Sequence, residues 1–295
     1  MAGHIVVGVD GSTPATAALE WAAADAQRRG LSLRVVHVCE QSSCGGEAAE
    51  YCARTLAAAA ERARELTRDV VASTDRLAGN VIETLIEEAA VADSVVLGGR
   101  GLGGFAGLVV GSVGLGVAGH AAGPVVIVRG PSVVQHDQVV VGYDGSAHSE
   151  AAMQYAVDQA RAREVRLRVV YAWQAPIYSP YAVAHQHLVQ AVYEEEIRAA
   201  DEHVTRWREK NPDIRITGEQ VAGHPVNALT KAGGTADLVV VGSRGLGGFA
   251  SAVFGSVSHG VLHHLACPVA VVRPHEPPPG TRPRCSSAAC RPPAC

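Results

Sequence analysis

Lysine is nearly missing from this chain: Lys210 and Lys231 are its only lysines among 295 residues. The sequence also has no G-x4-G-K-S/T phosphate loop and no G-x-S-x-G nucleophile elbow. Phosphoryl-transfer enzymes usually need a cation beyond magnesium and a positioned base. Both lysines are distant in sequence from the glycine-rich loops described below, so the sequence gives little support to such an enzyme, and we assign no catalytic residue.

An excess of basic charge is also absent. The formal net charge is -4 and the sequence pI is about 6.3. Proteins that bind nucleic acids or anionic membranes usually carry a basic surface. We therefore expect neither nucleic acid nor membrane as a partner. The first residues, MAGHIVVGVD, lack a basic segment followed by an apolar one, so we expect a cytoplasmic location.

Cysteines are few and unevenly placed. They form an early group, a single residue and a C-terminal ladder, in the order Cys39, Cys44 and Cys52; Cys267; Cys285, Cys290 and Cys295. An odd number in a cytoplasmic protein argues against a disulfide framework. The C-terminal ladder lacks the close C-x2-C pairs that are typical of zinc sites. We expect neither a disulfide framework nor a metal site in the tail.

What the chain does contain is an internal repeat. Residues 5–38 align without gaps to residues 139–172, at an offset of 134. Residues 93–129 align in the same way to residues 237–273, at an offset of 144, with about 23 of the 37 positions identical. The ten-residue difference between the offsets indicates an insertion between the two blocks. The chain is therefore two copies of one domain, each with a variable middle.

Within each copy, short apolar runs alternate with longer helical stretches, which indicates a parallel sheet covered by helices. In the first copy we predict strands at about 4–9, 31–38, 69–73, 94–97 and 124–128, with helices at about 14–29, 47–68 and 79–91 and from 112. Parallel strands need right-handed crossovers. The fold class is therefore α/β, with two tandem doubly wound, Rossmann-like domains at 1–130 and 139–273, a linker at 131–138 and a tail at 274–295.

Two glycine-rich turns mark the candidate site of each copy, since ligands of such sheets bind at the carboxyl ends of the strands. The first turn is D-G-S directly after the first strand, and the second is a G-x2-G-x9-G-S loop after the fourth strand. Glycines allow backbone N–H groups to approach a phosphate, and the helix that opens at the serine adds its positive end. These turns predict a nucleotide phosphate site in each copy.

At these residues the sequence resembles the universal stress protein family, in its tandem-domain, ATP-binding branch. The resemblance covers residues 4–273 and rests on V-G-x-D-G-S followed by G-x2-G-x9-G-S, present twice in the same order. It implies a sheet of strand order 3-2-1-4-5, which places the two glycine turns around one crevice. It also implies ATP with Mg²⁺ as the ligand and a regulatory role in the stress response.

The same resemblance implies roles for individual residues. Asp10 and Asp144 contact the ribose or Mg²⁺, the backbones of Val38 and Ala172 contact adenine, and the glycine loops hold the phosphates. The candidate binding residues are Gly8, Val9, Asp10, Val38, Gly98, Arg100, Gly101, Gly111, Ser112 and Val113 in the first copy, and Gly142, Tyr143, Asp144, Ala172, Gly242, Arg244, Gly245, Gly255, Ser256 and Val257 in the second.

Several alternatives stay open. The aspartates could only form Asx-turns or helix caps, and the glycines could only serve close packing. The helix face with His259, His263 and His264 has metal-ligand spacing without a further ligand, which favours packing. As functions, a slow ATPase or phosphotransferase and a nucleotide-free or flavin-binding scaffold compete with the ATP-binding regulator. A homo-oligomer and an unidentified protein partner are both compatible with the sequence.

The two copies differ in their middles. The first has the short stretch SSCGGEAAEYC where the second has the aromatic segment WQAPIYSPY, residues 173–181. Aromatic side chains can cover a base and exclude water, whereas a glycine-rich stretch loses more entropy when it is ordered. We therefore expect the second site to be the tighter one.

The tail generates a first testable prediction. Residues 274–295 are rich in Pro, Arg, Ser and Cys and have no apolar periodicity, so they bury too little surface to offset the entropy of ordering. Deleting them should leave the melting temperature and the ATP affinity unchanged. A large fall in melting temperature, measured by circular dichroism, would show instead that the tail packs on the domains.

Overall fold

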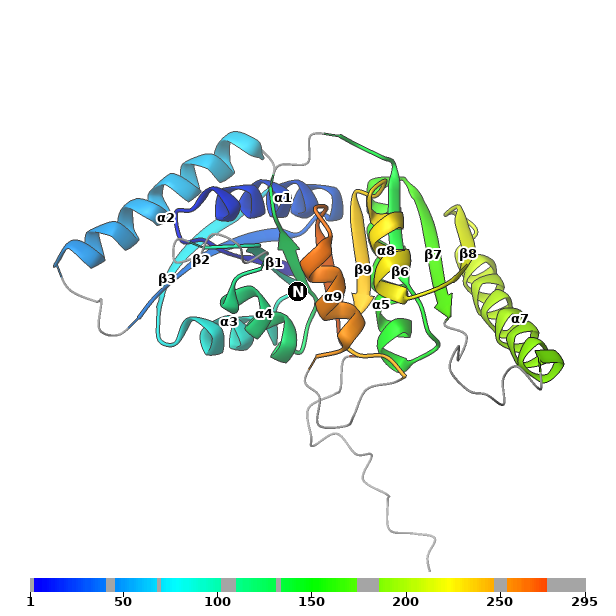
Figure 1. The fold of residues 1–295 in the computed structure, drawn as a ribbon. Coiled ribbons are helices and arrows are strands. Elements are labelled where there is room, and N and C mark those ends of the chain that lie inside the picture. The colour runs from blue at the N-terminus through cyan, green and yellow to red at the C-terminus, as the bar shows by residue number, and fades with distance from the viewer. Residues whose placement is uncertain are drawn as a thin grey trace, which may run out of the picture.

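Strands and helices alternate along the whole chain (Figure 1). The computed structural model describes residues 3–40, 46–67, 70–101, 110–130, 134–173, 186–246 and 254–274, without the side chains of residues 48, 186–194 and 196. The first half contains β1 (His4–Gly8), α1 (Thr13–Arg29), β2 (Ser32–Cys39), α2 (Gly46–Leu66), β3 (Ala72–Ala78), α3 (Val81–Ala89), β4 (Ser94–Gly98), α4 (Ser112–His120) and β5 (Val125–Val128). The second contains β6 (Gln138–Gly142), α5 (Ala147–Arg163), β7 (Arg166–Trp173), α7 (Gln186–Lys210), β8 (Ile216–Ala222), α8 (Pro225–Gly233), β9 (Leu238–Gly242), α9 (Ser256–His264) and β10 (Val269–Val272).

All ten strands belong to one sheet, in the order β3-β2-β1-β4-β5-β10-β9-β6-β7-β8. Within each half the strands are parallel and follow the order 3-2-1-4-5. The predicted α/β class and strand order are thereby confirmed. At the centre β5 and β10 pair antiparallel, with Val126 opposite Ala270. This pairing is the joint between the two halves of the sheet, and the repeat alone does not predict it.

Helices cover both faces of the sheet, and each face has its own hydrophobic core. One core is formed by residues of α1, α2, α5 and α7, and the other by residues of α3, α4, α8 and α9. In α1 the alanines 18, 22 and 26 are fully buried, as the apolar pattern predicts. Both cores contain residues of the two repeats, so the repeats are packed as well as hydrogen-bonded to each other.

The strand β3 lies later than predicted. We place the third strand at 69–73 from the sequence, whereas the structure has it at Ala72–Ala78. This strand is at the edge of the sheet and largely exposed, so its polar sequence ASTDRLA lacks the apolar run by which the other strands are recognised. Polar pairing helps to hold it, because Arg34 on β2 donates to Asp75 at 2.8 Å.

A buried polar cluster connects α1 of the first repeat with α5 of the second. Asp25 is fully buried, and its carboxylate accepts hydrogen bonds from Arg163 at 2.8 Å and from Gln159 at 3.0 Å. The guanidinium of Arg163 also lies 5.1 Å from the ring centre of Trp21. Because these groups form hydrogen bonds with each other instead of with water, removing one of them leaves a buried charge unpaired.

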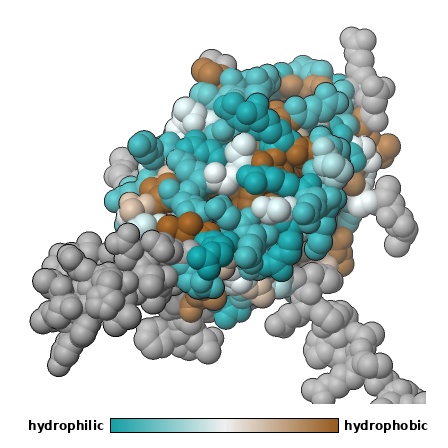
Figure 2. All heavy atoms as spheres, turned by 90° about the vertical axis from the view of Figure 1, so that its right-hand side faces the viewer, coloured by the Kyte–Doolittle hydropathy of each residue, from teal (hydrophilic) through white to brown (hydrophobic). Residues whose placement is uncertain are grey.

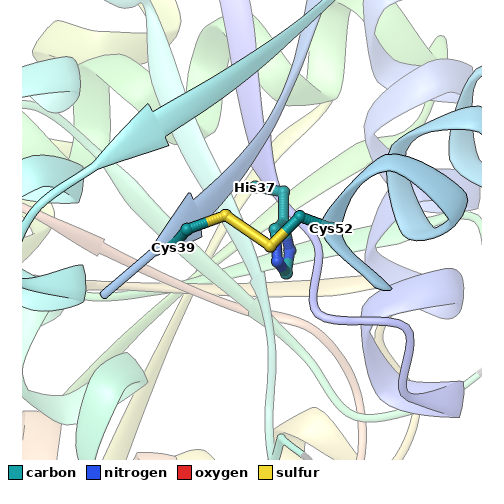
Figure 3. Close-up of side chains that lie close together, drawn as sticks. All are labelled: His37, Cys39 and Cys52. Atoms are coloured by element: carbon teal, nitrogen blue, oxygen red, sulfur yellow. A yellow bond between two sulfur atoms is a disulfide. The ribbon is translucent and has the colours of Figure 1, made fainter. Parts of the chain in front are cut away.

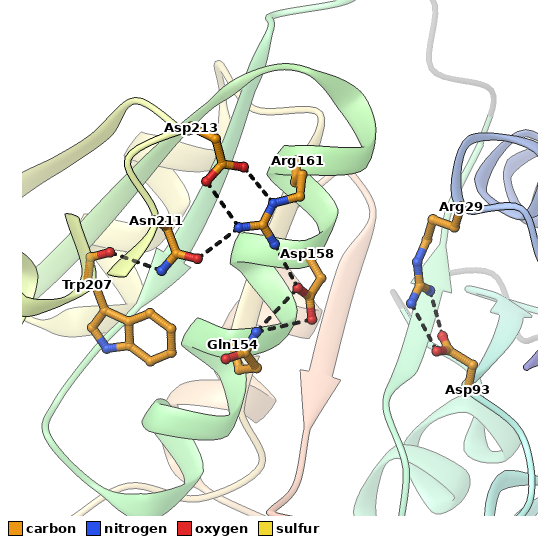
Figure 4. A network of polar contacts seen from close by, with 8 residues as sticks. All are labelled: Arg29, Asp93, Gln154, Asp158, Arg161, Trp207, Asn211 and Asp213. Carbon is orange, nitrogen blue, oxygen red and sulfur yellow. Dashed lines mark hydrogen bonds and ion pairs between the residues drawn. The ribbon is translucent and has the colours of Figure 1, made fainter. Parts of the chain in front are cut away.

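A second polar network is exposed and local to the second repeat (Figure 4). Arg161 on α5 donates to Asp213 at 2.7 Å and to Asn211 at 2.8 Å, and it pairs with Asp158 one helical turn earlier at 3.3 Å. Exposed ion pairs contribute only about 0–1 kcal/mol each. This network therefore positions the turn before β8 more than it stabilises the fold.

The surface at the β8 and α7 end of the molecule is mostly hydrophilic, with scattered hydrophobic residues (Figure 2). None of the helices in the described part of the chain has the length and apolar character required to span a membrane. The predicted tail is residues 274–295, and all of it except Pro274 lies outside the described residues.

The buried cluster generates a second prediction. Asp25→Ala should lower the free energy of unfolding by about 3–5 kcal/mol, because Arg163 would stay buried without its carboxylate partner. The matched control is Asp158→Ala, which removes an exposed partner of Arg161 and should cost less than about 1 kcal/mol. Urea unfolding of the two variants and the wild type measures both values. Equal losses of unfolding free energy in the two variants would show that the buried pairing of Asp25 stabilises the fold no more than an exposed ion pair does.

Candidate functional site

Each repeat has a cavity of about 690 Å³ at the carboxyl ends of its central strands. In the first repeat β1 and β4 are neighbours and parallel, so the turn after β1 and the loop after β4 open onto the same crevice. Every candidate residue of the first copy lines the first cavity, and every candidate residue of the second copy lines the second. The central parts of the glycine loops, residues 102–109 and 247–253, lie outside the described residues.

The backbone hydrogen bond of the aspartate turn is the same in both repeats. Asp10 accepts from the Ser12 N–H at 3.0 Å and from the Ser12 hydroxyl at 2.6 Å, and Asp144 accepts from the Ser146 N–H at 3.0 Å. The two serines then cap α1 and α5, since their side-chain oxygens accept from backbone N–H groups of the first turn. The Asx-turn alternative is thus real, and it also fixes the direction of the carboxylate.

The second carboxylate oxygen points toward the glycine loop. A Cβ atom on Gly101 would lie 2.5 Å from Asp10 Oδ2. A Cβ atom on Gly245, the matching position in the second repeat, would lie at least as close to Asp144 Oδ2. Asp144 Oδ2 also accepts from the Leu246 N–H at 3.1 Å. Glycine is required here because the aspartate approaches the loop backbone, in addition to any phosphate that the loop binds.

Two other candidate glycines serve packing. A Cβ atom on Gly98 would lie 2.7 Å from the carbonyl carbon of Pro14, and one on Gly242 would lie 2.8 Å from that of His148. At both places the end of a strand touches the first turn of a helix. The strand β4 touches α1 in the first repeat, and β9 touches α5 in the second. The packing alternative therefore applies to these two positions, although both also line their cavities.

The helices α4 and α9 begin at the cavities without a side-chain cap. Their N-cap residues are Gly111 and Gly255, and neither has a capping hydrogen bond from a side chain. The first N–H that bonds back to the N-cap carbonyl belongs to Leu115 in α4, at 3.2 Å. The N–H groups of the turn before it, with the positive end of the helix dipole, form an arrangement that suits an anion.

Arginine supplies the positive charge at these cavities. Arg100 lines the first and Arg244 the second, whereas Lys210 and Lys231 line neither. Arg244 donates to His148 at 3.2 Å. Burial lowers the pKa of Arg129, and the nearby charge of Arg100 lowers it further. The first glycine loop therefore has two guanidinium groups close to it.

Two of the histidines of α9 pack against each other. The rings of His259 and His263 are 4.4 Å apart, and burial lowers the pKa of His263, with the charge of His259 as the next cause. Among the described residues, the one group that could share a metal is in the first repeat and contains neither of them. The contact between these two rings is packing of the kind that the sequence favours over a metal site.

Sequence reasoning missed part of the cavity walls. His37, Glu40, Val81 and Leu85 line the first cavity, and Pro225, Leu229, Phe254 and His259 line the second. Four of these residues match between the repeats at the offset of 144, Val81 with Pro225 and Leu85 with Leu229, and they belong to α3 and α8. Extending the second block of the repeat toward the N-terminus finds them.

The aspartate turn is covered differently in the two repeats. In the first, the Tyr51 hydroxyl on α2 donates to the Asp10 carbonyl at 2.7 Å. In the second, Tyr143 donates to Glu150 and contacts His203 Nδ1 at 2.9 Å. Burial raises the pKa of Tyr143, and Glu150 raises it further. Of the aromatic segment 173–181, only Trp173 belongs to the described residues.

The cysteines depart from expectation at one place. We expect no disulfide framework, yet Cys39 at the end of β2 and Cys52 on α2 form a disulfide beside His37 (Figure 3). They are 13 positions apart, and the crossover from β2 to α2 brings them together. Counting cysteines in the sequence gives no information on such a contact.

Known proteins resemble the chain over nearly its whole length. Residues 1–129 and 136–273 match the model of the Universal stress protein family. A universal stress protein of Mycolicibacterium smegmatis is 33% identical over 291 residues, which cover 92% of this chain and 97% of that protein. One from Mycobacterium tuberculosis is 34% identical over 304 residues, which cover 92% and 96%.

A solved structure agrees with the fold. The crystal structure of a universal stress protein from Archaeoglobus fulgidus superposes with a TM-score of 0.66 at 23% identity, over 92% of this chain and 96% of that one. The resemblance found in the sequence is confirmed by the family model and by the mycobacterial relatives. The chain belongs to the Universal stress protein family, and it carries two tandem copies of the family's domain.

Proposed function

We propose that this protein binds ATP with Mg²⁺ in both repeats and acts as a nucleotide-dependent regulator in the stress response. One observation carries the proposal. All candidate residues of the first copy line one cavity, and all candidate residues of the second copy line another. A volume of about 690 Å³ lies within the usual range for small-molecule sites, about 300–1,000 Å³. The same aspartate turn, glycine loop and uncapped helix occur in each.

The chemistry of the cavity walls matches the parts of the nucleotide. The N–H groups at the start of α4 and α9, together with Arg100 and Arg244, suit the phosphates. The carboxylates of Asp10 and Asp144 suit a ribose hydroxyl or Mg²⁺, which prefers oxygen ligands. Bound Mg²⁺ would neutralise phosphate charge. The adjoining apolar walls, with Val36 and Leu85 in the first cavity, suit the base.

A binding role is favoured over an enzyme. The two aspartates are held by Asx-turns, and no lysine lines either cavity among the described residues. A slow ATPase or phosphotransferase is the alternative within the same site. A flavin-binding or nucleotide-free scaffold is the alternative in which the site does not bind ATP. The expected cytoplasmic location and an unidentified protein partner or homo-oligomer belong to the same proposal.

Glycine variants test the two sites separately. Titration calorimetry on the nucleotide-stripped protein should give two ATP sites, the second tighter. Gly101→Val should remove the first and Gly245→Val the second, because the new side chain would collide with the aspartate and block the loop backbone. Gly130→Val is the matched control, since a Cβ atom there meets no atom within 4 Å.

Three outcomes would contradict the two-site proposal. These are a wild-type stoichiometry of one, loss of all binding in either single variant, and loss of binding in Gly130→Val. Mass spectrometry of the ligand released on denaturation decides the ligand class. A flavin there, or an absence of ATP binding by calorimetry, would refute the proposed function itself.

Turnover is the next prediction. Hydrolysis of bound ATP should be far slower than the typical enzyme rate of about 10 per second, because the two aspartates are held by Asx-turns and no lysine lines either cavity among the described residues. Single-turnover measurement of phosphate release, with the Asp144→Asn variant as a comparison, checks it. A rate near the enzyme median that falls in the variant would make the protein an ATPase.

A further inference from the structure

A cluster of metal-ligating side chains lies beside the first cavity and has no assigned role (Figure 3). His37 and Cys39 are on β2, and Cys52 is on α2. One ring nitrogen of His37 and the two sulfur atoms all lie within 4.8 Å of one another. All three residues are buried, with relative exposures of 7%, 6% and 4% in that order.

The backbone fixes which ring nitrogen of the histidine carries a proton in the neutral ring. His37 Nδ1 lies 2.6 Å from the carbonyl oxygen of Val9. A carbonyl can only accept, so Nδ1 must carry the proton and donate it. In the neutral ring the lone pair is then on Nε2, the nitrogen that can bind a metal. Metal-binding histidines typically donate such a hydrogen bond, from the ring nitrogen that does not bind the metal to a backbone carbonyl or a carboxylate.

Secondary structure brings the two cysteines together. Cys39 is in the last position of β2, paired in register with Ala78 of β3. Cys52 is held on α2, one residue after Tyr51, whose hydroxyl donates to the Asp10 carbonyl at 2.7 Å. Strand and helix are each anchored by contacts other than the sulfur–sulfur bond. Reduction of the disulfide therefore leaves two buried thiols next to the imidazole of His37.

We propose that, once the Cys39–Cys52 disulfide is reduced, His37, Cys39 and Cys52 bind Zn²⁺. A dithiol reductant supplies two electrons and two protons, the sulfur–sulfur bond breaks, and the reductant becomes a disulfide. Zn²⁺ then displaces the protons of the two thiols and forms two zinc–sulfur bonds. Nε2 of His37 supplies the third ligand, and the fourth position stays available to water.

The donor set selects the metal. Thiolate and imidazole ligands suit Zn²⁺, whereas Mg²⁺ and Ca²⁺ prefer oxygen. Two thiolates balance the charge of the ion, so a buried complex carries no net charge from these groups. In a reducing cytoplasm, such thiols are more often metal-binding than paired in a disulfide.

The sequence of the second repeat has no counterpart of the two cysteines, since Cys267 is the only cysteine in residues 139–273. At the offset of 134, Tyr171 and Trp173 occupy the positions of His37 and Cys39. The other described cysteine, Cys267, is not in a metal-ligand group, and burial raises its pKa to about 11. The site would thus be a property of the first repeat, and its zinc binding does not depend on nucleotide.

The experiment uses the full chain with the other cysteines, Cys44, Cys267, Cys285, Cys290 and Cys295, replaced by serine. This protein is reduced with a phosphine, desalted without oxygen and titrated with Zn²⁺, and with Co²⁺ as a spectroscopic probe. We expect one zinc per chain and a thiolate-to-cobalt charge-transfer band. The same protein with its disulfide re-formed should bind neither ion.

Three variants separate the ligands. Cys52→Ser should abolish zinc uptake and the charge-transfer band. His37→Asn keeps a donor for the Val9 carbonyl but removes Nε2, and it should weaken zinc binding at least about tenfold. His120→Asn is the matched control, because His120 Nδ1 also lies 2.9 Å from a backbone carbonyl, that of Gly116, but has no cysteine group.

Several results would overturn the proposal. These are no zinc uptake by the reduced protein, equal uptake by Cys52→Ser, unchanged affinity in His37→Asn, or weakened affinity in His120→Asn. Circular dichroism of each variant without metal shows whether it is folded. If Cys52→Ser does not fold, Cys39→Ser in the same background takes its place and carries the same expectation.

Discussion

The strand that ends each repeat cannot face water. β5 reads VVIV and β10 reads VAVV, and every residue of both is buried. An isolated repeat would present such a strand as an open edge, with a row of unpaired backbone groups beside apolar side chains. Antiparallel pairing of β5 with β10 removes both edges at once. The shared cores and the contact of α1 with α5 depend on this joint, because it places the helices of the two repeats side by side on each face.

The direction of the joint also places the two cavities. Since β5 and β10 run antiparallel while each is parallel to its own neighbours, β1 and β4 end at the opposite edge of the sheet from β6 and β9. The cavities accordingly share no lining residue. Any communication between them must pass through the sheet or through the buried cluster around Asp25, Gln159 and Arg163, which connects α1 to α5.

Local patterns in the sequence predict most of this structure, and contacts between distant segments account for what they miss. Apolar periodicity finds the buried strands but misplaces β3, whose edge position leaves it polar. The repeat predicts two equal sheets, yet it contains no sign that β5 pairs with β10. Glycine spacing identifies the residues that line both cavities, but it contains no sign that Gly98 also packs against Pro14. His37 and the bonded pair Cys39 and Cys52 meet only through a crossover, so no spacing rule reveals them.

The variable middle of each repeat acts on one common place, the turn after the first strand. In the first repeat, His37 donates to the Val9 carbonyl and Tyr51 donates to the carbonyl of Asp10. In the second, Tyr143 replaces Val9 and is held by Glu150 and His203. The aspartate turns and glycine loops are nearly the same, so they provide a common frame. Tyr51 and His203 come from the segment between the second and third strands, whereas Tyr143 and Glu150 come from the turn itself and from α5. The groups around the aspartate therefore differ through the variable middle and also through substitutions within the common frame.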